Sequence, residues 1–314
     1  MKDFIHTPSF ITLLESGMKG WVMDGIAREA PAALNLENRT FYLPTRSIHR
    51  VRHRPIFWKL LNRSDSIVLF LHHRPLLKYH ELVDLARVRV FITHIDESEP
   101  LTESDFRILA RVQRIIFQNS NLMEWGVARG LIREKCLVAH GAISQDTFYP
   151  SQRPPDSIYA LISGECKGRK NPEIIKDLIS LRTELNFIIH GNGWSECFDG
   201  HLPPNLEILA FDKKQQAILM RNASALVTLS KNEGGPFPVL EALASGTPVL
   251  ATDTGFCREI IDQHCGVILY KSSTLDEISK ALDAVLNLKK ATYSSSLLPN
   301  EHSWKVFAER LYFL

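Results

Sequence analysis

The sequence lacks several patterns that would assign it to other classes of protein. Its five cysteines form no Cys-x-x-Cys pair, so we expect neither a disulfide framework nor a zinc site, and a reducing cytoplasm fits best. No apolar run approaches the roughly 18 residues that span a bilayer, and the start of the chain, MKDFIHTPSF, has no signal-peptide core. The formal net charge of +2 gives no reason to expect a nucleic-acid partner.

The sequence does contain a regular alternation of short apolar runs with helix-like stretches. The runs have the length of strands and are apolar throughout, which is typical of parallel sheets covered by helices on both faces. In the first half the predicted strands are Phe4–Thr7, Thr40–Pro44, Ile67–Leu71, Val90–Thr93, Arg114–Gln118 and Cys136–Ala139, and the predicted helices are Trp21–Leu34, Leu76–Arg87, Glu103–Arg111 and Leu122–Arg129.

A break in composition separates this half from a second one. YPSQRPPDS, at 149–157, holds three prolines and no apolar periodicity, which is typical of a linker. The alternation then restarts, with strands Ile158–Ser163, Asn186–His190, Leu206–Leu209, Ala225–Leu229, Pro248–Thr252 and Gly266–Leu269, and helices Pro172–Arg182, Lys213–Asn222, Pro238–Ser245, Arg258–Asp262 and Thr274–Leu288.

We therefore predict an α/β chain of two Rossmann-like domains that face each other across a cleft. The first spans residues 1–149, a linker spans 150–157, and the second domain spans 158–298. The C-terminal segment, 299–314, could pack back on the first domain. Ligands of such sheets bind outside the carboxyl ends of the strands, so we expect the site in the cleft.

The segment 230–259, SKNEGGPFPVLEALASGTPVLATDTGFCRE, carries the clearest chemistry. Its Gly-Gly pair lets the backbone approach a ligand closely. A helix is expected to start near Pro238, and its N–H groups and dipole favour a phosphate. Glu233 precedes this helix, and Glu241, eight residues later, lies about one turn inside it, where a carboxylate can accept bonds from a ribose diol. One segment thus offers contacts for the diphosphate, ribose and sugar of a nucleotide-sugar donor.

This segment resembles the signature of family 4 glycosyltransferases of the GT-B fold: an acid, a glycine-rich loop, a second Glu eight positions later, then Ala-x-Ala-x-Gly-x-Pro-Val. The resemblance implies that Glu233 contacts the transferred sugar and Glu241 the ribose. The family usually has an aromatic residue and a glycine after Glu-Gly, where this chain has Gly235 and Pro236. The loop residues that the resemblance places at the donor are Gly234, Gly235, Pro236 and Phe237.

Further loops of the second half resemble donor-binding loops of the same family. In SGECKGRKNP, at 163–172, Lys170 matches a Lys that contacts the donor diphosphate, and Glu165 stands where the family usually has an Arg. Lys167 or Arg169 would then supply the missing positive charge. The turns HGNG, at 190–193, and Phe211-Asp212-Lys213 resemble loops near the base. The donor contacts implied in these loops are Gly164, Lys167, Arg169, Lys170, Gly191, Asn192, Phe211 and Asp212.

The first half carries fewer matches. VFITHID, at 90–96, resembles the family strand whose terminal His faces the donor sugar, which implies that role for His94. Asn119-Ser120 and His140-Gly141-Ala142 match two further landmarks, the second with His140 where Asn is usual. The basic segment RSIHRVRHR, at 46–54, could contact an anionic acceptor or membrane surface, or form a solvated helix face. The residues that we place on the acceptor side are Gly17, Gly20, His72 and His73.

The resemblance implies a metal-independent, retaining transfer of a sugar from a nucleotide-diphosphate donor to a glycan, lipid-linked or small-molecule acceptor. Its catalytic groups would be Glu233, His94 and Lys170. The chain has no Asp-x-Asp, the usual metal–nucleotide motif of the other major glycosyltransferase fold, and no His/Asp cluster with metal-ligand spacing. No cofactor is expected besides the donor as co-substrate. We expect a cytoplasmic protein, with peripheral contact to the inner face of a membrane as an option.

Two alternatives stay open. An epimerase of nucleotide sugars shares this double-Rossmann scaffold and would need acid and base groups at a sugar carbon, which the sequence does not locate. A non-catalytic nucleotide-sugar-binding subunit is favoured by Glu165 in place of the usual Arg and by the compact first domain.

Overall fold

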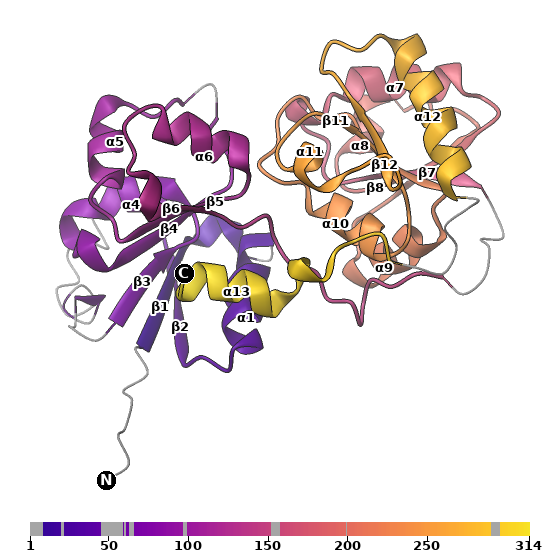
Figure 1. The fold of residues 1–314 in the computed structure, drawn as a ribbon. Helices are drawn as coiled ribbons and strands as arrows, with labels where there is room; N and C mark the ends of the chain where they lie inside the picture. The colour runs from indigo at the N-terminus through magenta and orange to yellow at the C-terminus, as the bar shows by residue number, and fades with distance from the viewer. Residues whose placement is uncertain are drawn as a thin grey trace. The chain divides into compact units, whose positions relative to one another are not determined.

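The structure is a computed structural model that describes residues 9–19, 22–44, 59, 61–62, 66–96, 99–151, 158–198, 200–289 and 296–314. Its contacts divide the chain into two compact units. The first domain is Met1–His140 together with Trp304–Leu314, and the second domain is Gly141–Ser303. Figure 1 shows that each domain is a parallel sheet with helices packed around it.

The first domain contains a parallel sheet in the order β2-β1-β3-β4-β5-β6. Residues on most of these strands are buried on both faces of the sheet, as their apolar composition predicts. The strands are β1 (Ser9–Glu15), β2 (Asn38–Leu43), β3 (Ser66–Phe70), β4 (Val88–Ile92), β5 (Arg114–Phe117) and β6 (Cys136–Val138), and the helices are α1 (Val22–Ala33), α4 (His73–Tyr79), α5 (Glu103–Leu109), α6 (Ser120–Val127) and α13 (Trp304–Tyr312).

The second domain contains a parallel sheet in the order β12-β11-β10-β7-β8-β9. Numbered within the domain, this is 6-5-4-1-2-3, which read from the other edge is 3-2-1-4-5-6, the order of doubly wound nucleotide-binding sheets. The strands are β7 (Tyr159–Ser163), β8 (Asn186–His190), β9 (Leu206–Leu209), β10 (Ala225–Thr228), β11 (Val249–Thr252) and β12 (Gly266–Leu269), and the helices are α7 (Pro172–Leu181), α8 (Trp194–Cys197), α9 (Lys213–Asn222), α10 (Phe237–Ala244), α11 (Cys257–Ile260) and α12 (Leu275–Lys289).

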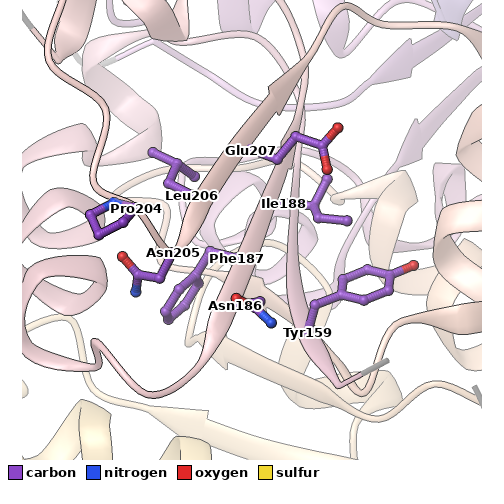
Figure 2. A pocket seen from close by; sticks show the side chains of 8 residues that line it. All are labelled: Tyr159, Asn186, Phe187, Ile188, Pro204, Asn205, Leu206 and Glu207. Carbon is purple, nitrogen blue, oxygen red and sulfur yellow. The ribbon is translucent and has the colours of Figure 1, made fainter. Parts of the chain in front are cut away.

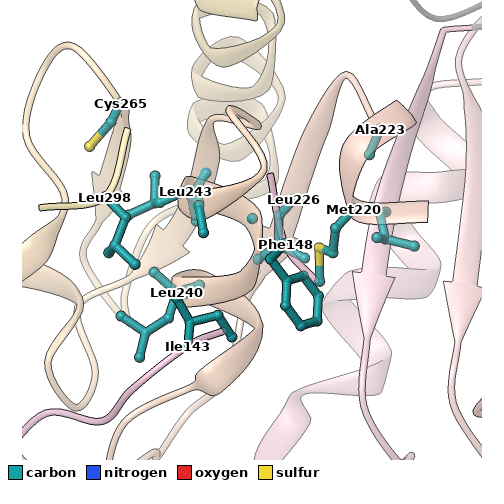
Figure 3. Close-up of a cluster of buried hydrophobic side chains, with 14 of the residues drawn as sticks. Ile143, Phe148, Met220, Ala223, Leu226, Leu240, Leu243, Cys265 and Leu298 are labelled. Carbon is teal, nitrogen blue, oxygen red and sulfur yellow. The ribbon is translucent and has the colours of Figure 1, made fainter. Parts of the chain in front are cut away.

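The core of the second domain includes the segment that enters it from the first domain. Ile143 and Phe148 are buried in one apolar cluster with Leu240 and Leu243 of α10 and Met220 of α9 (Figure 3). The burial of these two side chains ties residues 141–148 to the second domain. The contacts therefore divide the chain at 140/141, earlier than the boundary at 149/150 that the sequence predicts.

The C-terminal helix α13 packs on the first domain, where it lies beside α1 (Figure 1). The hydroxyl of Tyr312 is 3.1 Å from the hydroxyl of Thr12 in β1, and its ring meets Phe10 edge-on at 5.0 Å. The buried guanidinium of Arg89 donates to the carbonyls of Leu311 and Phe313, which the end of a helix leaves without intrahelical partners.

Most elements that the sequence predicts within the described residues occur, with ends shifted by one or two residues. The predicted helix Leu76–Arg87 is wrong at both ends. The α-helix begins at His73 and ends at Tyr79, and two turns of 3-10 helix, His80–Leu82 and Leu85–Arg87, follow. Asp84 accepts a hydrogen bond from the N–H of Ala86, which stabilises the second turn. Strand β1 was not predicted, and the predicted strand Phe4–Thr7 lies outside the described residues.

The remaining described helical turns are short 3-10 segments at loops. They are Ser16–Met18, Arg133–Lys135, Gly168–Lys170 and Asn300–His302.

Candidate functional site

The candidate site lies where the strand order of the second sheet reverses direction. Strand β7 is paired with β8 on one side and with β10 on the other, so the loops that follow β7 and β10 leave the same edge of the sheet in opposite directions. Ligands of open α/β sheets bind at such a switch point, outside the carboxyl ends of the strands. The loop after β7 carries Lys170 and Arg169, and the loop after β10 carries Glu233.

Glu233 forms ion pairs with two cations of the neighbouring loop, Lys170 and Arg169. Its Oε1 is 2.6 Å from the Nζ of Lys170, and its Oε2 contacts the guanidinium of Arg169. The side chains of Glu233 and Lys170 are only 9% and 12% exposed, which strengthens the attraction. Burial alone would raise the pKa of Glu233, but Lys170 and then Arg169 bring this pKa below its ordinary value. Glu233 is therefore a carboxylate at neutral pH.

Neighbouring groups hold this carboxylate in place. The hydroxyl of Ser230 donates to Oε1 of Glu233 at 3.0 Å, and the hydroxyl of Thr252, at the end of β11, donates to the carbonyl of Ser230 at 2.6 Å. The N–H of Lys231 donates to the carbonyl of Arg169 at 2.7 Å. The two loops are thus joined through both side chains and backbone.

The other predicted cation of the β7 loop, Lys167, has a different partner. Its Nζ is 2.8 Å from a carboxylate oxygen of Glu165, so the charge at 165 is balanced within the loop itself. Of the two candidates for the missing positive charge, the one that the structure brings to Glu233 is Arg169.

A disulfide joins the β7 loop to helix α8. It links Cys166 to Cys197, whose Cα atoms are 7.7 Å apart. The sequence predicts no disulfide framework and gives no sign of this pair, because the two cysteines are 31 residues apart and meet only since they follow the neighbouring strands β7 and β8. The other three cysteines are free.

The glycine-rich loop after β10 leads into α10, which begins at Phe237, one residue before the predicted start. Among the described residues no side chain caps the start of this helix. Pro238 has no N–H, and the N–H of Val239 donates to the carbonyl of Pro236 at 2.9 Å. The loop is tightly packed on the strand-end turn at Gly255, where a Cβ would lie 2.5 Å from the carbonyl oxygen of Gly234. The ring of Phe237 packs against Gly141.

Glu241 lies one turn inside α10, on the side that faces α9. Its Oε2 accepts a hydrogen bond of 2.6 Å from the Nε2 of Gln216. Burial raises the pKa of Glu241 to about 7, although the hydrogen bond from Gln216 and the charge of Lys213 act in the opposite direction. Nothing in the sequence marked Gln216, which looks like an ordinary helix residue.

The turns after β8 and β9 lie together. The N–H of Phe211 donates to the side-chain oxygen of Asn192 at 3.3 Å, and the ring of Phe211, 53% exposed, lies 5.2 Å from that of His190. Asp212 caps α9 by accepting from the N–H of Gln215. Gly191 contacts the loop after β7 so closely that a Cβ there would lie 2.0 Å from the carbonyl oxygen of Gly164.

In the first domain, three predicted histidines cluster at the carboxyl ends of β3 and β4. His72 and His73 stack at 4.4 Å, and His94 meets His72 edge-on at 6.1 Å. Burial brings the pKa of His73 to about 4 and lowers that of His72 well below its ordinary value, so both are neutral at pH 7. Gly17 lies in the exposed turn that follows β1. Gly20 and the basic segment 46–54 lie outside the described residues.

Other features of the described chain are less suited to a ligand with negative charge. A hollow of about 280 Å³ lies at the start of β7, β8 and β9, at the opposite edge of the sheet (Figure 2). Its charged lining residue is Glu207, and Tyr159, Asn186 and Phe187 lie beside it.

The described helices include none that is long and apolar enough to cross a membrane. No group of three or more His, Cys, Asp or Glu in this part of the chain could hold a metal ion.

Comparison with known proteins shows what this domain is similar to. Residues 144–295 match the family model described as Glycosyl transferases group 1. The second domain is therefore similar to the domain that this family model describes. An uncharacterized glycosyltransferase of Methanocaldococcus jannaschii is 27% identical over 165 residues, which are 50% of this chain and 45% of that protein. The match thus spans less than half the length of this relative.

Solved structures resemble the whole chain. The lipopolysaccharide outer core galactosyltransferase WaaB in its apo form has a TM-score of 0.70 and 16% identity, over 96% of this chain and 97% of that chain. Sucrose-phosphate synthase from Thermosynechococcus elongatus has a TM-score of 0.72 and 14% identity, over 96% and 94%. Anabaena Alr3699/HepE in complex with UDP-glucose has a TM-score of 0.72 and 12% identity, over 97% and 95%.

These similarities concern the fold, since all three identities are low. They confirm the predicted architecture of two parallel-sheet, Rossmann-like domains, which is the GT-B fold of glycosyltransferases. The assignment to family 4 and the retaining stereochemistry stay predictions.

The close contact at Gly191 gives a first testable prediction. Replacing Gly191 with Ala forces its Cβ against the carbonyl of Gly164, so we expect the free energy of unfolding to fall by about 1–3 kcal/mol, as in overpacked sites. Gly168→Ala is the matched control, because a Cβ at Gly168 meets nothing within 4 Å. Urea denaturation of both variants measures the difference, and equal stabilities would contradict the packing described for Gly191.

A second prediction concerns the pKa of Glu241, about 7 in the folded protein against an ordinary value of 4.5. A raised carboxyl pKa contributes stability that is complete below pH 4.5 and is lost as pH rises through 7. Glu241→Gln cannot ionise, so we expect this variant to be more stable than the wild type at pH 8. The free energy of unfolding of the variant relative to the wild type should be about 2–3 kcal/mol higher at pH 8 than at pH 5. Denaturant unfolding at both pH values tests this, and parallel profiles would assign the group a normal pKa.

Proposed function

We propose that this protein transfers a sugar from a nucleotide-diphosphate donor to a glycan, lipid-linked or small-molecule acceptor, with retention of configuration and without a metal ion. The observation that supports it most is the placement of Lys170, Arg169 and Glu233 at the switch point of a domain that matches the model of group 1 glycosyltransferases. Two cations are what a diphosphate needs when the protein alone supplies the positive charge.

Each part of the donor has a proposed partner. The diphosphate lies against Lys170, Arg169 and the start of α10, and Glu241 accepts from the ribose hydroxyls. The transferred sugar lies next to Glu233 and the amides of the loop before α10. The base lies at the edge of the sheet formed by the turns after β8 and β9, where the exposed ring of Phe211 offers a flat apolar surface. The residues of this base edge are Gly164, Gly191, Asn192, Phe211 and Asp212.

In the proposed reaction the bond between the sugar and the diphosphate loosens toward an oxocarbenium-like state. Lys170 and Arg169 stabilise the negative charge that develops on the departing diphosphate. The acceptor hydroxyl attacks from the face that the diphosphate leaves and gives its proton to an oxygen of the departing diphosphate, so no side chain has to form a covalent bond to the sugar. Glu233 holds the sugar hydroxyls in the orientation that this attack requires.

The acceptor side of the proposal rests on the first domain. His94 is proposed to contact the donor sugar, and Gly17, His72 and His73 to border the acceptor. The neutral state of His72 and His73 suits hydrogen bonding to hydroxyl groups rather than attraction of an anionic group. Both Anabaena HepE with UDP-glucose and WaaB, a galactosyltransferase, support a nucleotide-sugar donor by analogy.

One observation favours the alternative of a non-catalytic binding subunit. Glu165 forms an ion pair with Lys167, which removes one cation from the set that could bind the diphosphate. Binding and turnover must therefore be measured separately.

The donor is tested by a thermal-shift panel of UDP-, GDP-, ADP- and dTDP-sugars, because a ligand that binds only the folded state raises its melting temperature. We expect one class to stabilise the protein, and Lys170→Met to weaken its binding roughly 10- to 100-fold, as loss of a charge-assisted hydrogen bond does. Lys280→Met is the control, since Lys280 pairs with Asp276 on the exposed face of α12. Stabilisation by NAD in place of every nucleotide sugar would contradict the proposal.

Glu233→Gln separates catalysis from binding. The variant frees Lys170 and Arg169 from a carboxylate that neutralises them, so binding of the free nucleoside diphosphate should be unchanged or tighter. Loss of the carboxylate next to the sugar should lower the turnover of sugar transfer by roughly 100-fold. Titration calorimetry and a transfer assay measure the two effects. A wild type that binds nucleotide sugars but shows neither transfer nor donor hydrolysis would instead support the binding subunit.

A further inference from the structure

A chain of buried polar side chains runs beneath the candidate site. Gln216 of α9 lies at its centre and is 2% exposed, and His190, at the end of β8, is fully buried. The Nδ1 of His190 is 2.5 Å from the Oε1 of Gln216. The Nε2 of Gln216 is 2.8 Å from the hydroxyl of Ser163 and 2.6 Å from Oε2 of Glu241. Four residues from two strands and two helices thus form one connected network.

One hydrogen bond to His190 determines which atom donates and which accepts in every other hydrogen bond of this network. The N–H of Asp212 donates to the Nε2 of His190 at 3.0 Å, so Nε2 is the acceptor nitrogen and the ring proton is on Nδ1. That proton is donated to the Oε1 of Gln216, which turns the Nε2 of the amide toward Ser163 and Glu241. Both hydrogens of the amide nitrogen are then used, one for each partner.

This arrangement constrains Glu241 strongly. A buried amide whose oxygen and both hydrogens are satisfied has a single low-energy orientation, because any rotation leaves a buried polar group unpaired. Oε2 of Glu241 is therefore held on the α9 side. Its other oxygen, Oε1, has no hydrogen bond within the described part of the chain.

We propose that Gln216, oriented by His190, is a positioning residue that holds one oxygen of the Glu241 carboxylate and so presents the other to the ribose of the donor. This inference rests on the proposed function, which gives Glu241 the ribose contact, and it extends the site to two residues that do not touch the donor. It also explains why a polar pair occupies a buried place between a strand and a helix, where apolar side chains would pack at less cost.

The test uses Gln216→Met in the full chain, which keeps the size of the side chain and removes its amide. The probes are UDP, GDP and ADP, the 2′-deoxy and 3′-deoxy forms of whichever binds the wild type most tightly, and inorganic pyrophosphate. We expect Gln216→Met to bind the nucleoside diphosphate roughly tenfold more weakly. It should also lose most of the wild type's preference for ribose over the deoxy forms, while its affinity for pyrophosphate is unchanged.

Two further variants keep the test decisive. Gln216→Glu retains an acceptor for His190 but places a second carboxylate against Glu241, so it should weaken nucleotide binding at least as much, and it replaces the Met variant if that one does not fold. Ser163→Ala removes the other partner of the amide and leaves the bond to Glu241, so it should preserve the preference for ribose.

The outcomes separate this inference from the proposed function. A wild type that binds none of the three nucleoside diphosphates overturns the proposed function itself. A wild type that binds one of them and prefers ribose, together with Gln216 variants that keep the same affinity and the same preference, overturns only the positioning role. If the Gln216 variants bound the nucleoside diphosphate and pyrophosphate with equally reduced affinity, this would show a general loss of structure and would also overturn the positioning role.

Discussion

The charge of Glu233 is the constraint around which the candidate site of the second domain is organised. A largely buried carboxylate without partners would cost several kcal/mol or take up a proton. Lys170 and Arg169 prevent both, and they do so from a different loop. The loops after β7 and β10 must therefore stay close together, and the backbone bond between Lys231 and Arg169 keeps them so. The strand order supplies this closeness, because β7 and β10 are neighbours in the sheet.

Much of the second domain could be predicted from the sequence, because its strands are short apolar runs bounded by turn residues. Strands β8, β9 and β12 and helix α9 begin and end at the predicted residues. The glycine-rich loop and Pro238 likewise located the start of α10 to within one residue. The partner of Glu233 could not be predicted in this way, because Lys170 lies far away in the sequence and the local periodicity does not determine the strand order. The sequence left Lys167 and Arg169 equivalent, and only the fold distinguished them.

Other features could not be predicted from the sequence because they depend on which helices and strands become neighbours. The disulfide joins two residues that carry no pairing signal, and it exists because β7 and β8 are adjacent. Gln216 and His190 look like an ordinary helix residue and an ordinary strand end, and their network appears only when α9 and α10 pack together. In the first domain, apolar residues continue beyond Tyr79 with helical spacing, yet the backbone turns at Val83 because Asp84 caps a new turn.

The pKa values of the two acids of the motif are shifted in opposite directions. Two cations lower the pKa of Glu233, whereas burial raises the pKa of Glu241 to about 7 because the hydrogen bond from Gln216 and the charge of Lys213 do not offset it. This difference suits an anionic ligand. A diphosphate that enters the site already meets the charge of Glu233, and a second full negative charge on Glu241 would repel it further. In the proposed complex, hydrogen bonds from the ribose diol would favour the carboxylate form, so the ligand group proposed to contact Glu241 would complete its ionisation.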